Sequence, residues 1–207
     1  ATLMALLATA CGGEPGDEFR DAVPTRDQLA MNVPGSAGGS TSSSEGVGAL
    51  SRGLVGQRAD LYTLTRDVSR DVNGSIWVGL NVIESIIQHP PTFVDKGVVT
   101  WGPHTPPLEP LTWMLNVKKA GPKTYNYVLS ARHKTDLKGS FVPIIAGQST
   151  RGYSATFSGY TGTYTANASA LHALDPVTYR DTGKMIATYD TTGVRRKVEM
   201  ALKDYSE

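Results

Sequence analysis

Cysteine is nearly absent from this chain of 207 residues: Cys11 is the only one, so no disulfide can form within the chain. Stability must come from a hydrophobic core, which a chain of this length can build. An excess of one charge is lacking too, because 20 Lys and Arg stand against 19 Asp and Glu. This balance gives no electrostatic reason to expect nucleic acid as a partner.

Long apolar runs and catalytic motifs are also lacking. The nearest approach to a transmembrane helix is 76–87, and Asn81 and Glu84 interrupt it before the ~20 residues that a span needs. The chain has no nucleophile elbow, phosphate-binding loop or H-E-x-x-H motif. No metal-ligand spacing relates the four histidines, which are His89, His104, His133 and His172. We therefore expect no enzyme, no metal site and no cofactor.

Near the N-terminus, an apolar run (LMALLATA, 3–10) ends at Cys11, and Gly12 and Gly13 follow. This pattern resembles the lipobox of bacterial envelope lipoproteins, although Ala8 stands where that family usually has Leu. The resemblance implies that 1–10 is part of a signal peptide cut before Cys11, and that Cys11 carries the lipid. Residues 1–10 hold no Lys or Arg, so we expect the gene product to start further upstream. The alternative is a buried structural cysteine in an N-terminal helix.

Location and domain organisation follow from that resemblance and from composition. A Gly rather than an Asp directly after the cysteine resembles the signal for sorting to the outer membrane. The periplasmic and the outer face of that membrane both remain as alternatives. The polar segment 11–26 is interpreted as a lipidated tether, and 27–207 as a single α+β domain. Within that domain, the Gly/Ser-rich segment 35–48 is predicted to be a loop.

Apolar periodicity predicts two helices in the first half of the domain. Spacings of three, four and seven favour a helix over 50–72, which Asn73 and Gly74 end. Ser75 is a plausible N-cap for a second helix that continues to 87, before Pro90. Its apolar residues are Ile76, Leu80, Ile83 and Ile87, with Val78, Val82 and Ile86 widening the stripe. Ahead of both helices, alternation at Leu29, Met31 and Val33 predicts a short edge strand.

From Thr92 onward the period changes to two, which is typical of strands. We expect strands over 98–101, 111–118, 125–132, 141–147, one or two within 153–165, 184–190 and 195–202, and a helical turn over 168–174. Hairpin spacing predicts an α+β fold: a strongly twisted, mainly antiparallel sheet or open half-barrel of about eight strands, with the two N-terminal helices on one face. Because 203–207 follows the last strand without a stabilising element, we expect a longer biological protein with further strands.

Aromatic side chains are the candidate ligand-binding residues. They lie on the second helix and on strands, and are Trp77, Trp113, Tyr125, Tyr127 and Phe141. Aromatic rows in sheets usually form core and cross-strand pairs. The other interpretation is a cavity between helix and sheet, an architecture similar to lipid-carrying envelope lipoproteins whose open barrel is lidded by helices.

The leading functional hypothesis is a lipid-anchored envelope lipoprotein that binds an apolar or envelope ligand without catalysis. Its partners would be the membrane, through the anchor, and that ligand. The first alternative is a structural or surface-display lipoprotein with a protein partner, and the second is an envelope hydrolase. An apolar cavity of several hundred Å³ would favour a ligand site over the first alternative.

Overall fold

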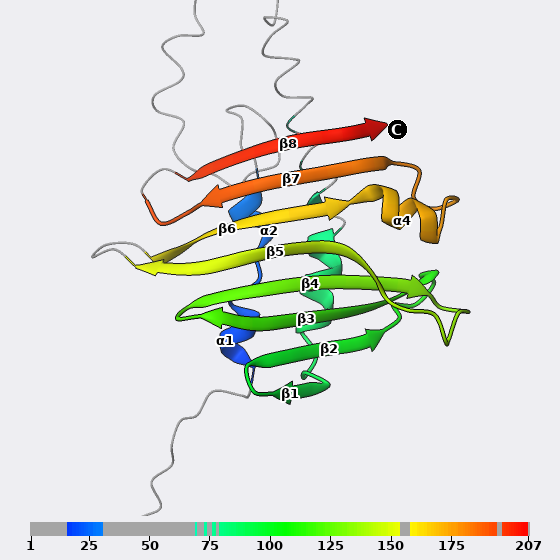
Figure 1. The fold of residues 1–207 in the computed structure, drawn as a ribbon, viewed down its shortest axis with the longest axis horizontal. Coiled ribbons are helices and arrows are strands. Elements are labelled where there is room, and N and C mark those ends of the chain that lie inside the picture. The colour runs from blue at the N-terminus through cyan, green and yellow to red at the C-terminus, as the bar shows by residue number, and fades with distance from the viewer. Residues whose placement is uncertain are drawn as a thin grey trace, which may run out of the picture.

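The computed structural model describes residues 16–30, 69, 73, 76–77, 79–153, 158–193 and 196–206. In this part of the chain, one sheet runs in the order β1 to β8, and each strand pairs antiparallel with its sequence neighbours (Figure 1). The order makes β1 and β8 the two edges, so the sheet is open. The mainly antiparallel sheet of about eight strands predicted from the sequence is confirmed.

Each strand predicted from Val98 onward is present, but several are longer than predicted, and the strand over 93–95 was not predicted. The strands are β1 (Phe93–Asp95), β2 (Val98–His104), β3 (Leu111–Gly121), β4 (Thr124–His133), β5 (Val142–Tyr153), β6 (Ser158–Asn167), β7 (Thr182–Asp190) and β8 (Lys197–Ser206). The labelled helices are α1 (Asp17–Arg20), α2 (Arg26–Leu29) and α4 (Ala168–Leu174). The predicted end of the last strand at residue 202 is wrong, because residues 203–206 belong to β8.

One face of the sheet forms the core. Alternate residues of β4 are buried, and the register aligns Leu129 with Leu115 of β3 and Ile145 of β5. Residues in between face the other way, and there Asn126, which pairs with Gln148, is exposed. This alternation of buried and exposed positions is the period-two pattern of a sheet with one covered face.

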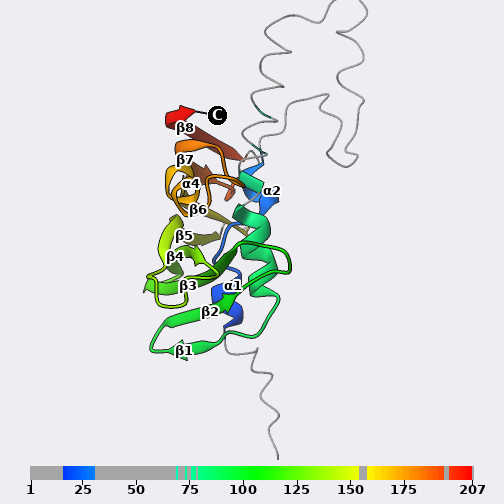
Figure 2. The ribbon, with the colours of Figure 1, turned by 90° about the vertical axis from the view of Figure 1, so that its right-hand side faces the viewer.

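A helix over 79–87 lies on the buried face, together with α1 and α2 (Figure 2). Its residues Leu80, Ile83 and Ile86, and the preceding Ile76, are at most 1% exposed and belong to the same core cluster as the strand residues. Three of them, Ile76, Leu80 and Ile83, belong to the four-residue apolar stripe that the sequence predicts for the second helix. None of the helices described is long and apolar enough to span a bilayer.

Two strand glycines make room for tyrosines in the core. Tyr127 lies opposite Gly147 in the register, and its hydroxyl donates a 2.7 Å hydrogen bond to the Thr163 carbonyl oxygen. A Cβ on Gly147 would fall on that oxygen and on the Tyr127 hydroxyl. Tyr189 lies opposite Gly162 in the same way. Glycine at these positions is a packing requirement rather than a turn signal.

The predicted tether over 11–26 is wrong from Gly16 onward. Phe19, Ala22 and Val23 are buried, and the Phe19 ring meets the Tyr125 ring edge-on with centroids 5.4 Å apart. Charged neighbours such as Asp17, Glu18 and Arg20 made the segment look polar, although they flank apolar residues that pack on the sheet.

The predicted strand at 29–33 is also wrong at its start, because Leu29 ends α2 and is fully buried. A capping box begins that helix, in which the Thr25 backbone N–H donates to Gln28 Oε1 at 3.1 Å. Residues 31–33, the Gly/Ser-rich segment 35–48 and the helix predicted over 50–72 lie outside the described residues, apart from Ser69, which is helical and buried.

Candidate ligand-binding site

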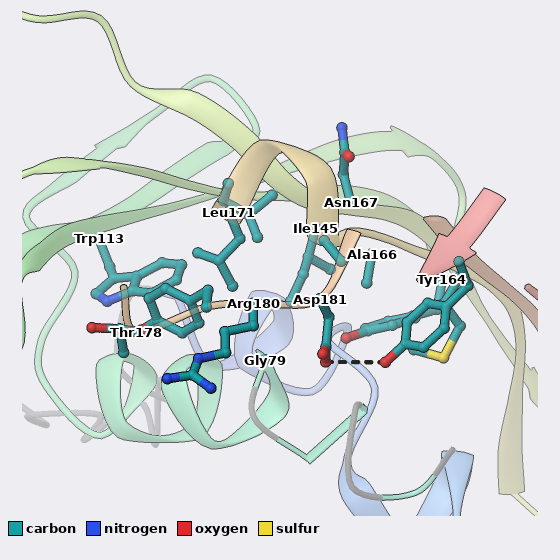
Figure 3. Close-up of a pocket in the computed structure, with 15 residues that line it drawn as sticks. Gly79, Trp113, Ile145, Tyr164, Ala166, Asn167, Leu171, Thr178, Arg180 and Asp181 are labelled. Atoms are coloured by element: carbon teal, nitrogen blue, oxygen red, sulfur yellow. Dashed lines mark hydrogen bonds between the residues drawn. The ribbon is translucent and has the colours of Figure 1, made fainter. Parts of the chain in front are cut away.

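A cavity of about 420 Å³ opens on the core side of the sheet, where β6 ends and β7 begins (Figure 3). Its walls come from the helix over 79–87, from β3, β5, β6, β7 and β8, and from α4 with the segment that follows it. The described residues that line it are Gly79, Trp113, Ile144, Ile145, Tyr164, Ala166, Asn167, Ala168, Leu171, Thr178, Tyr179, Arg180, Asp181, Met185 and Tyr205.

Local sequence explains why the chain turns around this cavity. Tyr164 and Ala166 project to the core side of β6 because they alternate with Thr165. Asn167 then ends the strand and caps α4, because its Oδ1 accepts from the Ala170 backbone N–H at 3.2 Å.

After α4, a turn brings the chain back across the mouth of the cavity. The Asp175 Oδ1 accepts from the backbone N–H groups of Val177 and Thr178, at 3.1 and 3.2 Å. This Asx-type turn leads the chain to Tyr179, whose backbone carbonyl lies 2.8 Å from the Nδ1 of His172. The segment over 175–181 is thus tied to α4, and the two form one wall.

The floor of the cavity is apolar, and among the described residues it contains one buried hydroxyl that makes no hydrogen bond. Tyr164 is 0% exposed, and among the described residues its hydroxyl makes no hydrogen bond. Burial raises the pKa of Tyr164 well above its usual range, so the group stays neutral. A Cβ built on Gly79 would lie 3.0 Å from this hydroxyl, so glycine keeps the helix close to the cavity floor.

The rim is polar. The Tyr179 hydroxyl donates to Glu109 Oε2 at 3.3 Å, and burial followed by the Glu109 charge raises the pKa of Tyr179 to about 12. The Tyr205 hydroxyl donates to Asp181 Oδ2 at 3.0 Å (Figure 3). Arg180 lies beside Asp181 and is exposed. An apolar floor with a few polar groups at the mouth is the usual composition of a small-molecule site.

Of the five aromatic residues predicted to bind ligand, Trp113 alone lines this cavity. Trp77 is helical but 43% exposed. The Tyr125 hydroxyl donates to Glu18 at 2.9 Å, Tyr127 bonds Thr163, and Phe141 stacks with the Arg132 guanidinium, 4.7 Å from the ring centroid. The structure therefore does not bring the five residues together.

Sequence reasoning missed most of the cavity walls. The alternation along 162–166 would have placed Tyr164 and Ala166 on the core side, and the predicted helical turn over 168–174 would have supplied Leu171. Nothing local indicates that these residues meet Gly79 and Met185. That proximity depends on strand register and on where the helix crosses the sheet.

The remaining candidates lie elsewhere. Cys11 is outside the described residues. The rings of His89 and His104 are 5.1 Å apart, yet within the described ranges no group of three or more His, Cys, Asp or Glu residues could hold a metal. A smaller cavity of about 160 Å³ beside α1 is lined by charged residues, including Glu18, Lys123 and Arg151.

Comparison with protein-family models, curated proteins and solved structures finds no match for this chain. The case for a function therefore depends on the cavity itself.

Proposed function

We propose that this protein is a non-catalytic binding module for a small apolar ligand, which occupies the cavity between the sheet, α4 and the helix over 79–87. The observation that carries the proposal is a cavity of about 420 Å³ with an apolar floor. It lies beside a core whose large side chains are almost fully buried. Ligand sites commonly have volumes of ~300–1,000 Å³, and this cavity falls in that range.

The chemistry of the lining favours binding over turnover. Among the described residues around the cavity there is no His, Ser, Cys, Lys or Glu. Its most deeply buried ionisable group, Tyr164, is held neutral by its raised pKa. Asp181, the one carboxylate among the described lining residues, accepts a hydrogen bond from Tyr205 and lies at the mouth. A nucleophile with an adjacent base, which acyl or phosphoryl transfer requires, is not assembled among these residues.

The rival hypothesis, a structural or surface-display lipoprotein, predicts a close-packed interface where this cavity lies. Substitutions that fill the cavity with a larger side chain distinguish the two hypotheses, because only a ligand-binding protein should lose binding when the cavity is filled. Ala166→Phe places a ring inside it, and Thr165→Phe places the same ring on the outer face of β6 as the matched control. Ala168→Phe, at the start of α4, is a second filling variant in case the first fails to fold.

Binding is measured by titrating the apolar fluorophore N-phenyl-1-naphthylamine. Wild type and Thr165→Phe are expected to bind it with equal affinity and to enhance its emission, whereas each folded filling variant binds at least tenfold more weakly. Bound ligand should also raise the melting temperature, since a ligand at 100 times its dissociation constant adds about 2.7 kcal/mol. If the wild-type protein leaves the emission unchanged, or if filling variants bind like wild type, the proposal is wrong.

We further propose that Cys11 anchors the protein to the bacterial cell envelope, at the outer membrane, through a thioether-linked diacylglycerol and an N-acyl chain. Several acyl chains together hold a protein stably, whereas one chain binds marginally. The support is the lipobox-like run before Cys11. Cys11→Ser, expressed with its natural leader, is expected to leave the membrane fraction and to lose the lipid mass. Retention in the membrane after a high-salt wash, at wild-type mass, would overturn the anchor.

A further inference from the structure

We infer that the ligand is an amphiphile with an apolar body and one anionic head group, and that its head pairs with Arg180 at the mouth of the cavity. This inference rests on the proposed function, because it assigns the ligand class of the same cavity.

The charges at the mouth are not equally available. Among the described residues, the cavity lining holds two charged side chains, Arg180 and Asp181, which are neighbours in the segment between α4 and β7. Asp181 accepts a hydrogen bond from the Tyr205 hydroxyl at 3.0 Å. Within the described part of the chain, Arg180 makes no ion pair or hydrogen bond, and its guanidinium extends toward the helix that carries Gly79 (Figure 3). Asp181 keeps its charge but shares one oxygen with Tyr205, whereas none of the described residues occupies the hydrogen-bond donors of the Arg180 guanidinium, which are all available to a ligand.

The cavity separates an apolar end from this cation. Ile145, Ala166 and Met185 lie on the core side, and Arg180 is exposed at the rim. A ligand that fills the apolar end and extends to the mouth places its terminal group beside the guanidinium. The planar guanidinium donates two parallel hydrogen bonds to a carboxylate or phosphate, which makes an oxyanion the best-matched head group.

A neutral head group would leave the guanidinium in water and gain nothing from it. A cationic head group would be repelled by Arg180, and Asp181, its one counter-charge among the described lining residues, is the very next residue in the chain. The carboxylate of a free fatty acid and the phosphate of a lipid-derived monoester share the required chemistry. The test therefore contains both.

The test displaces bound N-phenyl-1-naphthylamine with four ligands that share a ten-carbon chain, each below its critical micelle concentration and at low ionic strength. These are decanoate, decyl phosphate, decanol and decyltrimethylammonium. For the wild-type protein, at least one of the two anions is expected to displace the fluorophore about tenfold more effectively than decanol, and the cation no better than decanol. Preference for decanoate indicates a fatty acid, and preference for decyl phosphate indicates a phosphate monoester.

Arg180→Gln should remove the advantage of the anions over decanol. Lys184→Gln is the matched control, because Lys184 is an exposed cation that alternates with the buried Met185 and faces the other side of β7. It should change nothing. Equal displacement by anion and alcohol, or an anion preference that survives Arg180→Gln, overturns the inference while the proposed function stands. Failure of the fluorophore and all four ligands to bind overturns the proposed function itself.

Discussion

Replacing Gly147 with alanine tests the packing of the sheet that builds the cavity. The new Cβ would fall on the Thr163 carbonyl oxygen and on the Tyr127 hydroxyl, which are hydrogen-bonded to each other. The carbonyl belongs to β6 and cannot rotate away, so Tyr127 or the strand must move. Overpacking costs ~1–3 kcal/mol, and loss of the Tyr127 hydrogen bond adds ~0.5–1.5 kcal/mol.

A value near 3 kcal/mol is a large share of the ~5–15 kcal/mol that stabilises a typical domain. At ~2–4 °C per kcal/mol for a chain of this size, it lowers the melting temperature by roughly 6–12 °C. Thermal unfolding followed by circular dichroism measures this shift. Gly121→Ala is the matched control, because the nearest atom to its Cβ would be Thr124 Cβ at 3.9 Å. If both variants melt within a degree or two of wild type, the arrangement of Tyr127 over Gly147 is incorrect.

Three further predictions concern the elements that cover the core. Ile83 is 1% exposed, so Ile83→Asp buries an unpaired charge and lowers the free energy of unfolding by several kcal/mol. The variant should lose its cooperative thermal transition, and an unchanged melting temperature would contradict the helix packing. Glu84→Ala should lower the free energy of unfolding by less than ~1 kcal/mol, because the 2.6 Å ion pair between Glu84 and Arg26 is partly exposed. A loss of stability as large as that of Ile83→Asp would refute this reasoning. The Tyr125 hydroxyl and then the Lys119 ammonium lower the pKa of Glu18 below 4.5, so its stabilising effect is present above that pH and is lost as the pH falls through the lowered value. The melting temperatures of wild type and Glu18→Gln should therefore differ at neutral pH and converge in acid, and a pH-independent difference would refute the assignment.

The sheet could be predicted from sequence because each long strand carries its own evidence. Apolar and polar residues alternate over 111–118 and 125–132, except at Met114 and Val128, and Gly121 and Pro122 mark a turn between the two segments. Strands β3 and β4 therefore follow from local pattern alone. The second helix was predictable for the same reason, since Ile76, Leu80 and Ile83 repeat at helical spacing.

Short elements and non-local contacts were not predictable in this way. A helix of four residues, such as α1, is too short to show periodicity, so Phe19 was hidden among charged neighbours. Trp77 is aromatic and next to a buried stripe, yet it is about 100° around the helix from Ile76 and faces solvent. The cavity brings together Gly79, Trp113 and Leu171, which are far apart in sequence, and only the register of the folded sheet places them around one space.

The central claim is that an apolar ligand occupies the cavity. Amide chemical-shift mapping by ¹H–¹⁵N NMR, with decanoate or decanol added to isotopically labelled protein, tests it most directly. The account predicts that the largest shifts gather at cavity residues such as Ile145, Ala166, Leu171 and Met185. Shifts that gather instead on the outer face of the sheet, at Asn126, Gln148 and Thr163, or no shifts at saturating ligand, would contradict it.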